Sequence, residues 1–443
     1  MPCGVEKAKL MCYNQKDPVT GKENEKMDKF AHNPLLDDNT FVPDVEAHVW
    51  EDGRIYLYGS FDIKGKKGFC SPVHHVYSSS DMINWTDHGV VFSISDSKWA
   101  KDCGVLYAPD CAYKNGVYYL YYCVPDGRCG VARSTSPTGP FEDVGIIEGV
   151  WGIDPAVFID DDGQAYLYWG QLTWCKAAKL KDNMVQIQED TVTTPLTVKE
   201  HEFHEGSSVK KINGRYYYLF ADTHRHGNRP SCLGYAVSDH PLKGFRYGGV
   251  IIDNFGCDPA VWNNHGSMEY FNGQWYIFYH RSTHGTDSSR RVCAEVIKFN
   301  SDGSIPEIVQ TTSGVGGKIP ADAKLPASYA CCMTGNVRIE SDTEKGGLVL
   351  GGIKPLDTAT FRYLDFNGEN TAAVKMKANG KCRAEIYIDG KYTAEIDVPP
   401  SHEYKACFAE FDGIYGAKVL TLSFYGEFDR ASVEYLTFTK QKN

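Results

Sequence analysis

The sequence has 443 residues, of which 42% are hydrophobic, so the chain is long enough to form two or three domains with buried cores. Its formal net charge of −11 argues against nucleic acid or an anionic membrane as the main partner. It contains no run of about eighteen apolar residues, the length that would predict a membrane span.

The first 30 residues are polar and of mixed charge, and they predict an extension on the surface. They lack an apolar core of the signal-peptide type. The 15 cysteines follow no regular framework and include no CxxC pair, which favours reduced thiols and argues against a zinc site. These observations predict a cytoplasmic protein.

Five copies of one sequence unit follow, between residues 31 and 315. In each copy a short strand-forming run leads to a tight turn with glycine, and a second run rich in aromatic and branched residues follows the turn. The copies are Val42–Ser60, Tyr107–Tyr122, Gly152–Gly170, Phe203–Asp222 and Asn263–Arg281. Their turn glycines are Gly53, Gly116, Gly163, Gly214 and Gly273, separated by 63, 47, 51 and 59 residues. A strand-rich repeat of about 50 residues predicts a β-propeller, here with five blades.

Acidic residues recur at one position of this unit. The residues nine positions before the turn glycines are Asp44, Tyr107, Asp154, Glu205 and Asn264. If the first strand of each unit is the innermost, equal register places these side chains around one mouth of the central channel. Three carboxyl groups in one cleft repel one another, so their presence indicates a functional site. Asp110, only six residues before its glycine, is expected deeper in the channel or facing a neighbouring blade, with a structural role.

Three clustered acids are typical of glycoside cleavage. The reaction needs one protonated and one ionised carboxyl group on either side of the scissile bond. A third acid near the proton donor raises the donor's pKa by like-charge repulsion. A propeller lectin is the alternative from another class, but binding alone would use aromatic and amide side chains.

The blade motifs resemble those of glycoside hydrolase family 43, five-bladed propeller enzymes that trim arabinose and xylose from plant polysaccharides. The similarity covers residues from about 33 to about 315. The matching segments are Pro43–Asp44, Tyr107–Asp110, Ile153–Phe158, Glu205–Gly206, Asn264–Ser267 and Phe278–Arg281.

The resemblance implies an inverting mechanism in which Asp44 is the general base and Glu205 the general acid. Asp154 would tune the pKa of the acid and orient it. No cofactor is required for this chemistry.

The resemblance also implies residues that bind substrate or metal. Arg281, with Tyr107 and Ile153 on the pocket wall, would contact the sugar. His265 is the candidate ligand of a structural calcium ion. Tyr107 stands where many relatives have Trp, and the residues after Asp44 also differ, which affects sugar specificity rather than the chemistry.

The expected activity is removal of terminal α-L-arabinofuranosyl residues from small oligosaccharides derived from arabinoxylan or arabinan. A β-xylosidase in xylan degradation is the alternative, since it would use the same acids with a different pocket wall. The sequence does not indicate an oligomeric state.

The pattern changes beyond residue 315, after a linker of small residues. Residues 325–443 carry alternating strands and predict an antiparallel β-sandwich of the jelly-roll type. Tyr363–Phe366 and Ile386–Gly390 faintly resemble carbohydrate-binding module family 6. We expect a packing domain in preference to a sugar-binding module.

Overall fold

The computed structural model describes residues 29–227, 229–258, 263–342 and 346–441. The chain divides into one compact unit over Ala31–Gly317 and a second that begins at Lys318. The sequence-based boundaries, 31–315 and 325–443, fall close to this division. The extension predicted over residues 1–30 lies, apart from its last two residues, outside the described residues.

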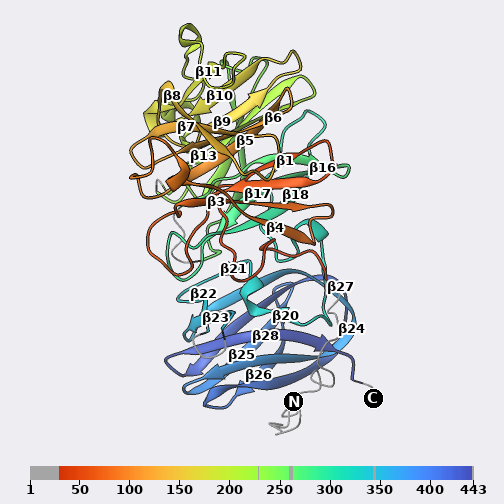
Figure 1. Ribbon diagram of the computed structural model, residues 1–443. Coiled ribbons are helices and arrows are strands. Elements are labelled where there is room, and N and C mark those ends of the chain that lie inside the picture. Colours follow the sequence, from red (N-terminus) through yellow and green to blue (C-terminus); the bar gives the residue numbers. More distant parts are fainter. Residues whose placement is uncertain (1–28, 228, 259–262, 343–345, 442–443) are drawn as a thin grey trace, which may run out of the picture. The chain divides into compact units, whose positions relative to one another are not determined.

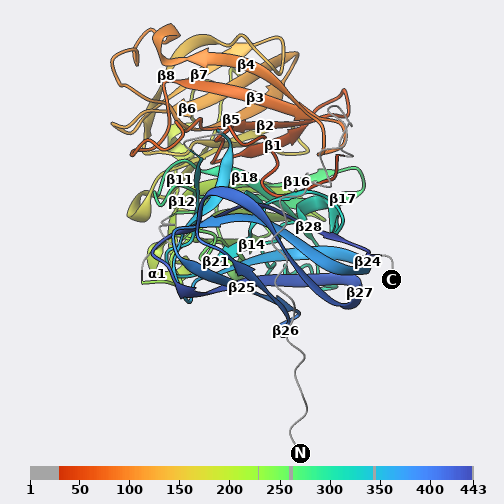
Figure 2. The ribbon, with the colours of Figure 1, turned by 90° about the horizontal axis from the view of Figure 1, so that it is seen from below.

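The first unit is the predicted five-bladed β-propeller, built from five antiparallel sheets (Figure 1). Blade one contains β1 (Glu46–Val49), β2 (Ile55–Gly59), β3 (Val73–Ser79) and β4 (Trp85–Ser93). Blade two contains β5 (Tyr107–Lys114), β6 (Val117–Cys123), β7 (Arg128–Ser134) and β8 (Glu142–Trp151). Figure 2 shows the four strands of blade one side by side in chain order.

The other three blades follow the same order. Blade three contains β9 (Ala156–Ile159), β10 (Ala165–Trp169) and β11 (Lys176–Lys179). Blade four contains β12 (Phe203–Ile212), β13 (Arg215–Asp222), β14 (Cys232–Ser238) and β15 (Arg246–Asp253). Blade five contains β16 (Met268–Phe271), β17 (Gln274–Arg281) and β18 (Arg291–Ile297).

The first strand of each blade is the innermost, as the sequence predicts. The strand β1 contacts β5 and β16, and β9 contacts β5 and β12. The five turn glycines all have positive φ, between 72° and 85°, a conformation that glycine adopts without steric cost. Each turn therefore joins an innermost strand to its neighbour.

The apolar core of the propeller lies between the blades. Five clusters of buried side chains each combine residues from two successive blades, including a cluster between blades five and one. Tyr121 of blade two and Trp169 of blade three, both at most 2% exposed, belong to one such cluster. Because aromatic side chains bury large areas, each blade is stabilised mainly by its neighbours.

The start of the propeller is tied to its last blade. The Leu35 amide donates to the Val292 carbonyl at 2.9 Å. The Asn33 side-chain amide donates to Glu295 at 2.9 Å, and Glu295 also accepts the Thr311 backbone N–H at 2.6 Å. We call this connection the closure of the propeller. It closes the ring by hydrogen bonds between residues more than 250 positions apart.

The second unit is an antiparallel β domain, which confirms the predicted fold class. Its strands are β19 (Ile319–Pro320), β20 (Leu325–Pro326), β21 (Cys332–Met333), β22 (Arg338–Ser341), β23 (Leu348–Ile353), β24 (Thr358–Ala378), β25 (Lys381–Ile388), β26 (Lys391–Val398), β27 (Ser401–Glu427) and β28 (Ala431–Thr439). The long strands β24 and β27 pair along most of their lengths and curve through the domain (Figure 1). Buried residues alternate with partly or fully exposed ones along much of β24 and β25, the pattern of a strand with one face on a core.

Helices are few. The only α-helix among the described residues is α1 (Val198–His201), which is too short to span a membrane. The 3-10 helices are η1 (Ile94–Asp96), η2 (Leu172–Trp174), η3 (Glu189–Thr191), η4 (Gly314–Gly316) and η5 (Ala327–Tyr329). All thirteen cysteines within the described residues are free thiols.

Candidate active site

Two of the three predicted acids lie just before the innermost strands of their blades. Asp44 precedes β1 and Asp154 precedes β9, and their φ angles are 56° and 55°. Left-handed backbone is costly for residues other than glycine, and such strain concentrates at functional sites. The same unusual conformation at the same point of blades one and three indicates that the backbone is held there to orient the two carboxyl groups.

The two carboxyl groups meet at His265 of blade five. His265 Nδ1 lies 3.8 Å from Asp44 Oδ1 and 3.8 Å from Asp154 Oδ2. Gly206, with φ of 73°, faces the His265 ring: a Cβ atom there would lie 3.1 Å from it. The Gly206 N–H donates to Asp154 Oδ2 at 3.1 Å, which links blade four to the same centre.

Glu205 is the more accessible of the three acids. Its side chain is 17% exposed, against 7% for Asp44 and Asp154. Glu205 Oε2 accepts a hydrogen bond of 2.6 Å from Gln171 and lies 3.7 Å from His204 Nε2. An acid that is oriented by a neighbour yet reachable from solvent is suited to meet a substrate.

Arg290, in the loop before β18, bridges two buried acids. Its Nη1 donates to Asp44 Oδ1 at 2.7 Å, while Nε and Nη2 donate to the two oxygens of Asp62 at 2.9 and 3.1 Å. The Arg290 side chain is 4% exposed and that of Asp62 is fully buried. His280 Nδ1 also lies 3.5 Å from Asp44 Oδ1. The planar guanidinium thus supplies positive charge beside Asp44 and is itself anchored by Asp62.

Burial and repulsion control the charges of this cluster. Burial raises the pKa of Asp154 well above its usual range, and the charges of Glu205 and Asp44 raise it further. Burial lowers the pKa of His265, so its imidazole is neutral at pH 7. Asp154 therefore keeps its proton to a higher pH than an isolated carboxyl group does.

Tyr107 and Ile153 are half-buried beside this cluster. Burial raises the pKa of the Tyr107 phenol, and the charge of Asp154 contributes to that shift, which places the ring within electrostatic reach of the acid. Ile153 immediately precedes Asp154, and its carbonyl accepts the Gly170 N–H at 2.8 Å. Both residues are therefore next to the acids.

Arg281 is placed elsewhere, contrary to the sequence-based expectation that it binds substrate. Its side chain is 2% exposed, and its Nη2 donates to the Thr311 carbonyl at 2.6 Å and to Tyr279 Oη at 2.7 Å. It also lies 3.7 Å from Glu295. Successive residues of a strand point to opposite faces, so with His280 facing Asp44, Arg281 faces into the blade.

The repeat register also slips by one residue in blade five. Asn264 donates to the Ser231 carbonyl at 3.0 Å, and it is the next residue, His265, that meets the acids. The strand β16 begins only at Met268, so the side chains before it need not alternate between two faces as those of a strand do. Asp110 faces its neighbours, as predicted: it bonds His48 of blade one and the Val157 N–H of blade three.

Sequence reasoning missed Arg290, Asp62 and Gln171. All three lie in loops between strands, outside the repeated unit. Nothing in their local sequence marks them, because they are brought to the site by the ring and not by a motif.

Carboxyl groups from three blades lie at one point of the propeller channel. Such a cluster can supply the general acid and the general base that cleavage of a glycosidic bond requires. The model of the glycosyl hydrolases family 43 matches residues 31–305, more than half of the chain. The protein belongs to this family.

Known relatives extend the match beyond the propeller. A xylosidase/arabinosidase of Thermoclostridium stercorarium is 32% identical over 451 residues, covering 87% of this chain and 93% of the relative. A crystal structure of a family 43 arabinoxylan arabinofuranohydrolase from Bacillus subtilis, in complex with cellotetraose, has a TM-score of 0.56 at 25% identity and covers 93% of this chain and 99% of that chain. A β-xylosidase/α-arabinofuranosidase from a compost microbial metagenome, solved with xylotriose in a calcium-free form, has a TM-score of 0.56 at 31% identity over 64% of this chain and 98% of that chain.

Proposed function

We propose that this family 43 enzyme removes terminal α-L-arabinofuranosyl residues, with inversion, from oligosaccharides derived from arabinoxylan or arabinan. The observation that carries the proposal is the meeting of Asp44, Asp154 and the Glu205–Gly206 segment around His265. The names of the relatives, which include arabinosidase and arabinoxylan arabinofuranohydrolase, support the choice of sugar.

In this proposal Glu205 is the general acid and Asp44 the general base. Glu205 protonates the glycosidic oxygen as the C–O bond breaks, and Asp44 accepts a proton from the water that attacks the opposite face of the sugar. The greater exposure of Glu205 and its bond to Gln171 suit the donor role. The charge of Arg290 fixes Asp44 in place.

Asp154 is a positioning residue in this scheme. Its carboxyl group accepts the N–H of Gly206, the residue that follows the acid, and so fixes the backbone that carries Glu205. The charges of Asp154 and Glu205 repel one another, so the two carboxyl groups do not readily ionise together, and this repulsion is the tuning role that we propose for Asp154.

Tyr107 and Ile153 are proposed as walls of the sugar pocket, because they flank Asp154. His265 is proposed as a contact of a calcium ion: it offers one imidazole nitrogen, and water would supply the remaining ligands that calcium requires. Such an ion would add positive charge beside Asp44 and Asp154.

The test is release of 4-nitrophenol from the α-L-arabinofuranoside and the β-D-xyloside, with Glu205→Gln beside the wild type. The proposal expects the arabinofuranoside to be preferred and its cleavage to fall by about 10²–10⁴-fold in the variant. Following the anomeric product by NMR tests inversion. Unchanged turnover in Glu205→Gln would refute the assignment of the acid.

A β-xylosidase is the second candidate, favoured by the double name of the Thermoclostridium relative. It uses the same acids, so the same assay separates the two: xyloside preference, also lost in Glu205→Gln, would replace the first candidate and keep the mechanism.

We further propose a reducing, cytoplasmic compartment and a packing role for the C-terminal domain. The thirteen free cysteines fit a reducing environment. Cell fractionation tests the location. Binding of the full-length Glu205→Gln variant, which does not hydrolyse the polymer, to insoluble arabinoxylan is measured in the presence of a saturating arabino-oligosaccharide that occupies the active site; binding that persists would show a sugar site outside the active site, on the second domain if substitutions in the propeller leave that binding unchanged.

A further inference from the structure

A cavity of about 410 Å³ opens between blades four and five, and the proposed hydrolysis does not use it. It lies at the turns of these blades, where β12 ends at Ile212 and where β16 and β17 contribute Tyr270 and Trp275. Its volume falls in the range of pockets that hold small molecules, roughly 300–1,000 Å³. We call it the turn-end cavity.

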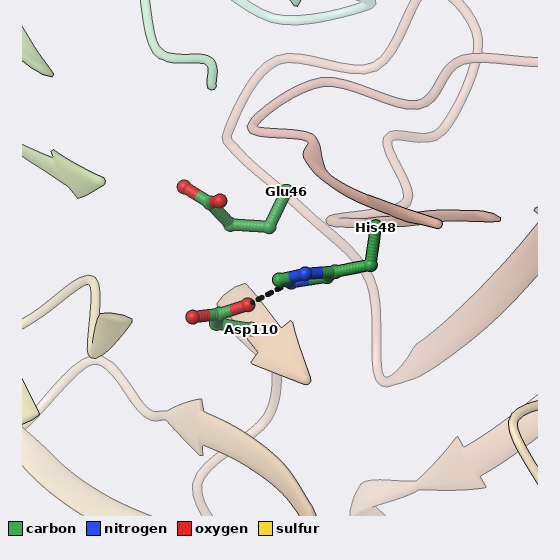
Figure 3. Close-up of side chains that lie close together, drawn as sticks. All are labelled: Glu46, His48 and Asp110. Carbon is green, nitrogen blue, oxygen red and sulfur yellow. Dashed lines mark hydrogen bonds and ion pairs between the residues drawn. The ribbon is translucent and has the colours of Figure 1, made fainter. Parts of the chain in front are cut away.

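The turn-end cavity is far from the acids. The strand β12 carries Glu205 near its start, and Lys211, which lines the cavity, follows six residues later, a rise of roughly 20 Å. Figure 3 shows Glu46 and His48 of β1 and Asp110 of β5 pointing toward one another on the inner strands, between the level of the acids and that of the turns. The acids and the cavity are therefore separate sites.

Aromatic rings form one wall of the cavity. Tyr270 and Trp275 are cross-strand partners, with ring centroids 5.5 Å apart and planes inclined at 53°. Phe299 contacts Trp275 edge-on at 6.1 Å and Tyr217 at 5.9 Å. The Tyr270 side chain is nevertheless left open, since the residue is 49% exposed. An open ring of this size gains free energy when the C–H groups of a ligand pack against it.

The rest of the lining is polar but offers no unpaired charge. Asn213 and Asn300 are exposed, and their amide groups can both donate and accept hydrogen bonds. Among the described residues that line the cavity, Lys211 alone is charged, and its Nζ is paired with Asp160 at 2.6 Å and Asp161 at 2.8 Å. The lining therefore suits a neutral ligand that has many hydroxyl groups.

Hydrogen bonds fix the loop that borders the cavity. The Asn300 N–H donates to the Ser304 carbonyl at 2.9 Å, and the Gly303 N–H donates to the Asn300 carbonyl at 3.0 Å. Tyr217 Oη donates to the Gly303 carbonyl at 2.7 Å, and a Cβ atom at Gly303 would lie 2.8 Å from that hydroxyl. The wall is thus formed before a ligand arrives, which lowers the entropy cost of binding.

We propose that the turn-end cavity binds a segment of the neutral pyranose chain of a xylan-type polysaccharide, as a second sugar site on the propeller. A pyranose ring presents a flat C–H face to an aromatic ring and hydroxyl groups to amides, which matches this lining. Such a site keeps the enzyme on the polymer and raises the effective concentration of bonds that it can cleave. The site does not depend on which sugar the acids release.

The experiment measures the retardation of the full-length Glu205→Gln variant in native gels that contain soluble arabinoxylan. A saturating arabino-oligosaccharide, whose puckered furanose rings suit the cavity less, occupies the active site. We expect retardation to persist, and adding Tyr270→Ala to raise the apparent Kd for arabinoxylan at least about fivefold. Asn213→Gly should weaken binding too; because Asn213 has a φ of 50°, glycine keeps the turn and removes only the amide.

Tyr392→Ala is the matched control, since Tyr392 is a 55% exposed tyrosine of β26 in the second unit. It should bind like the parent. In the chain with Glu205 intact, Tyr270→Ala should leave turnover of 4-nitrophenyl glycosides unchanged. Absence of retardation would overturn the proposal. So would retardation that Tyr270→Ala and Asn213→Gly leave unchanged, which would assign the binding to another surface. A wild type that cleaves neither glycoside would refute the proposed function, while the gels would still test the cavity.

Discussion

Arg290→Lys tests whether the guanidinium that bridges two acids matters for turnover. In the wild type three nitrogens of Arg290 donate to Asp44 and Asp62 at 2.7–3.1 Å. A lysine keeps the charge but has one nitrogen, so it does not reproduce the fork that holds both acids. At least one charge-assisted hydrogen bond is lost.

The expected fall in kcat follows from the loss of one such hydrogen bond. A hydrogen bond to a charged group contributes about 1.5–3 kcal/mol. If the lost bond is the one to Asp44 and orients the base in the transition state, kcat falls about 10- to 150-fold. KM should change less, because the proposed role of Asp44 is to activate water and not to bind the sugar.

The assay measures kcat and KM on 4-nitrophenyl α-L-arabinofuranoside, or on the β-D-xyloside if that is preferred, together with Tm. Arg291→Lys is the control: Arg291 is equally buried but donates to the Leu36 carbonyl at 3.3 Å and to Asp38 at 3.0 Å. It should lower Tm and leave kcat nearly unchanged. Wild-type kcat in Arg290→Lys, with a Tm loss like that of Arg291→Lys, would refute the reasoning.

Three further predictions concern the site and the closure. Asp44→Asn should lower kcat by about 10²–10⁴-fold in the same assay, and a smaller loss would argue against its role as base. Gly206→Ala should lower both kcat and Tm, because its Cβ would lie 3.1 Å from the His265 ring at a φ of 73°; unchanged kinetics would mean that the ring moves freely. Burial raises the pKa of Glu295 to about 7, against the opposing charge of Arg281. The folded carboxyl group then binds a proton that the unfolded chain releases, so wild-type stability declines between about pH 4.5 and pH 7. Glu295→Gln should therefore gain stability relative to the wild type over that interval, by up to ~3 kcal/mol in denaturant unfolding, and a flat difference would show that Glu295 stays ionised.

The sequence predicts the parts of this fold that depend on short-range pattern. Turn glycines such as Gly163 mark the hairpins, and the acids at matched register, Asp44 and Asp154, lie at one centre as expected. These succeed because a strand has a fixed period of two and a tight turn requires particular residues.

The positions of Arg281 and Arg290 could not be predicted from the local sequence pattern. Arg281 belongs to a motif-like run, yet alternation along β17 turns it into the blade. Arg290 has no motif, and only the closed ring brings it to Asp44, 246 residues earlier in the chain. The path of the loop and the geometry of the ring decide which arginine contacts Asp44. A local sequence pattern predicts neither of them.

The closure determines when the candidate active site forms. Asp44 belongs to the first blade, while Arg290, His280 and His265 around it come from the last. During synthesis, almost the whole propeller must therefore be made before Asp44 can contact these residues. A ring that opens between blades five and one separates the base from the charge that holds it. Catalytic activity therefore depends on the closure and can be used to measure whether blades five and one are joined.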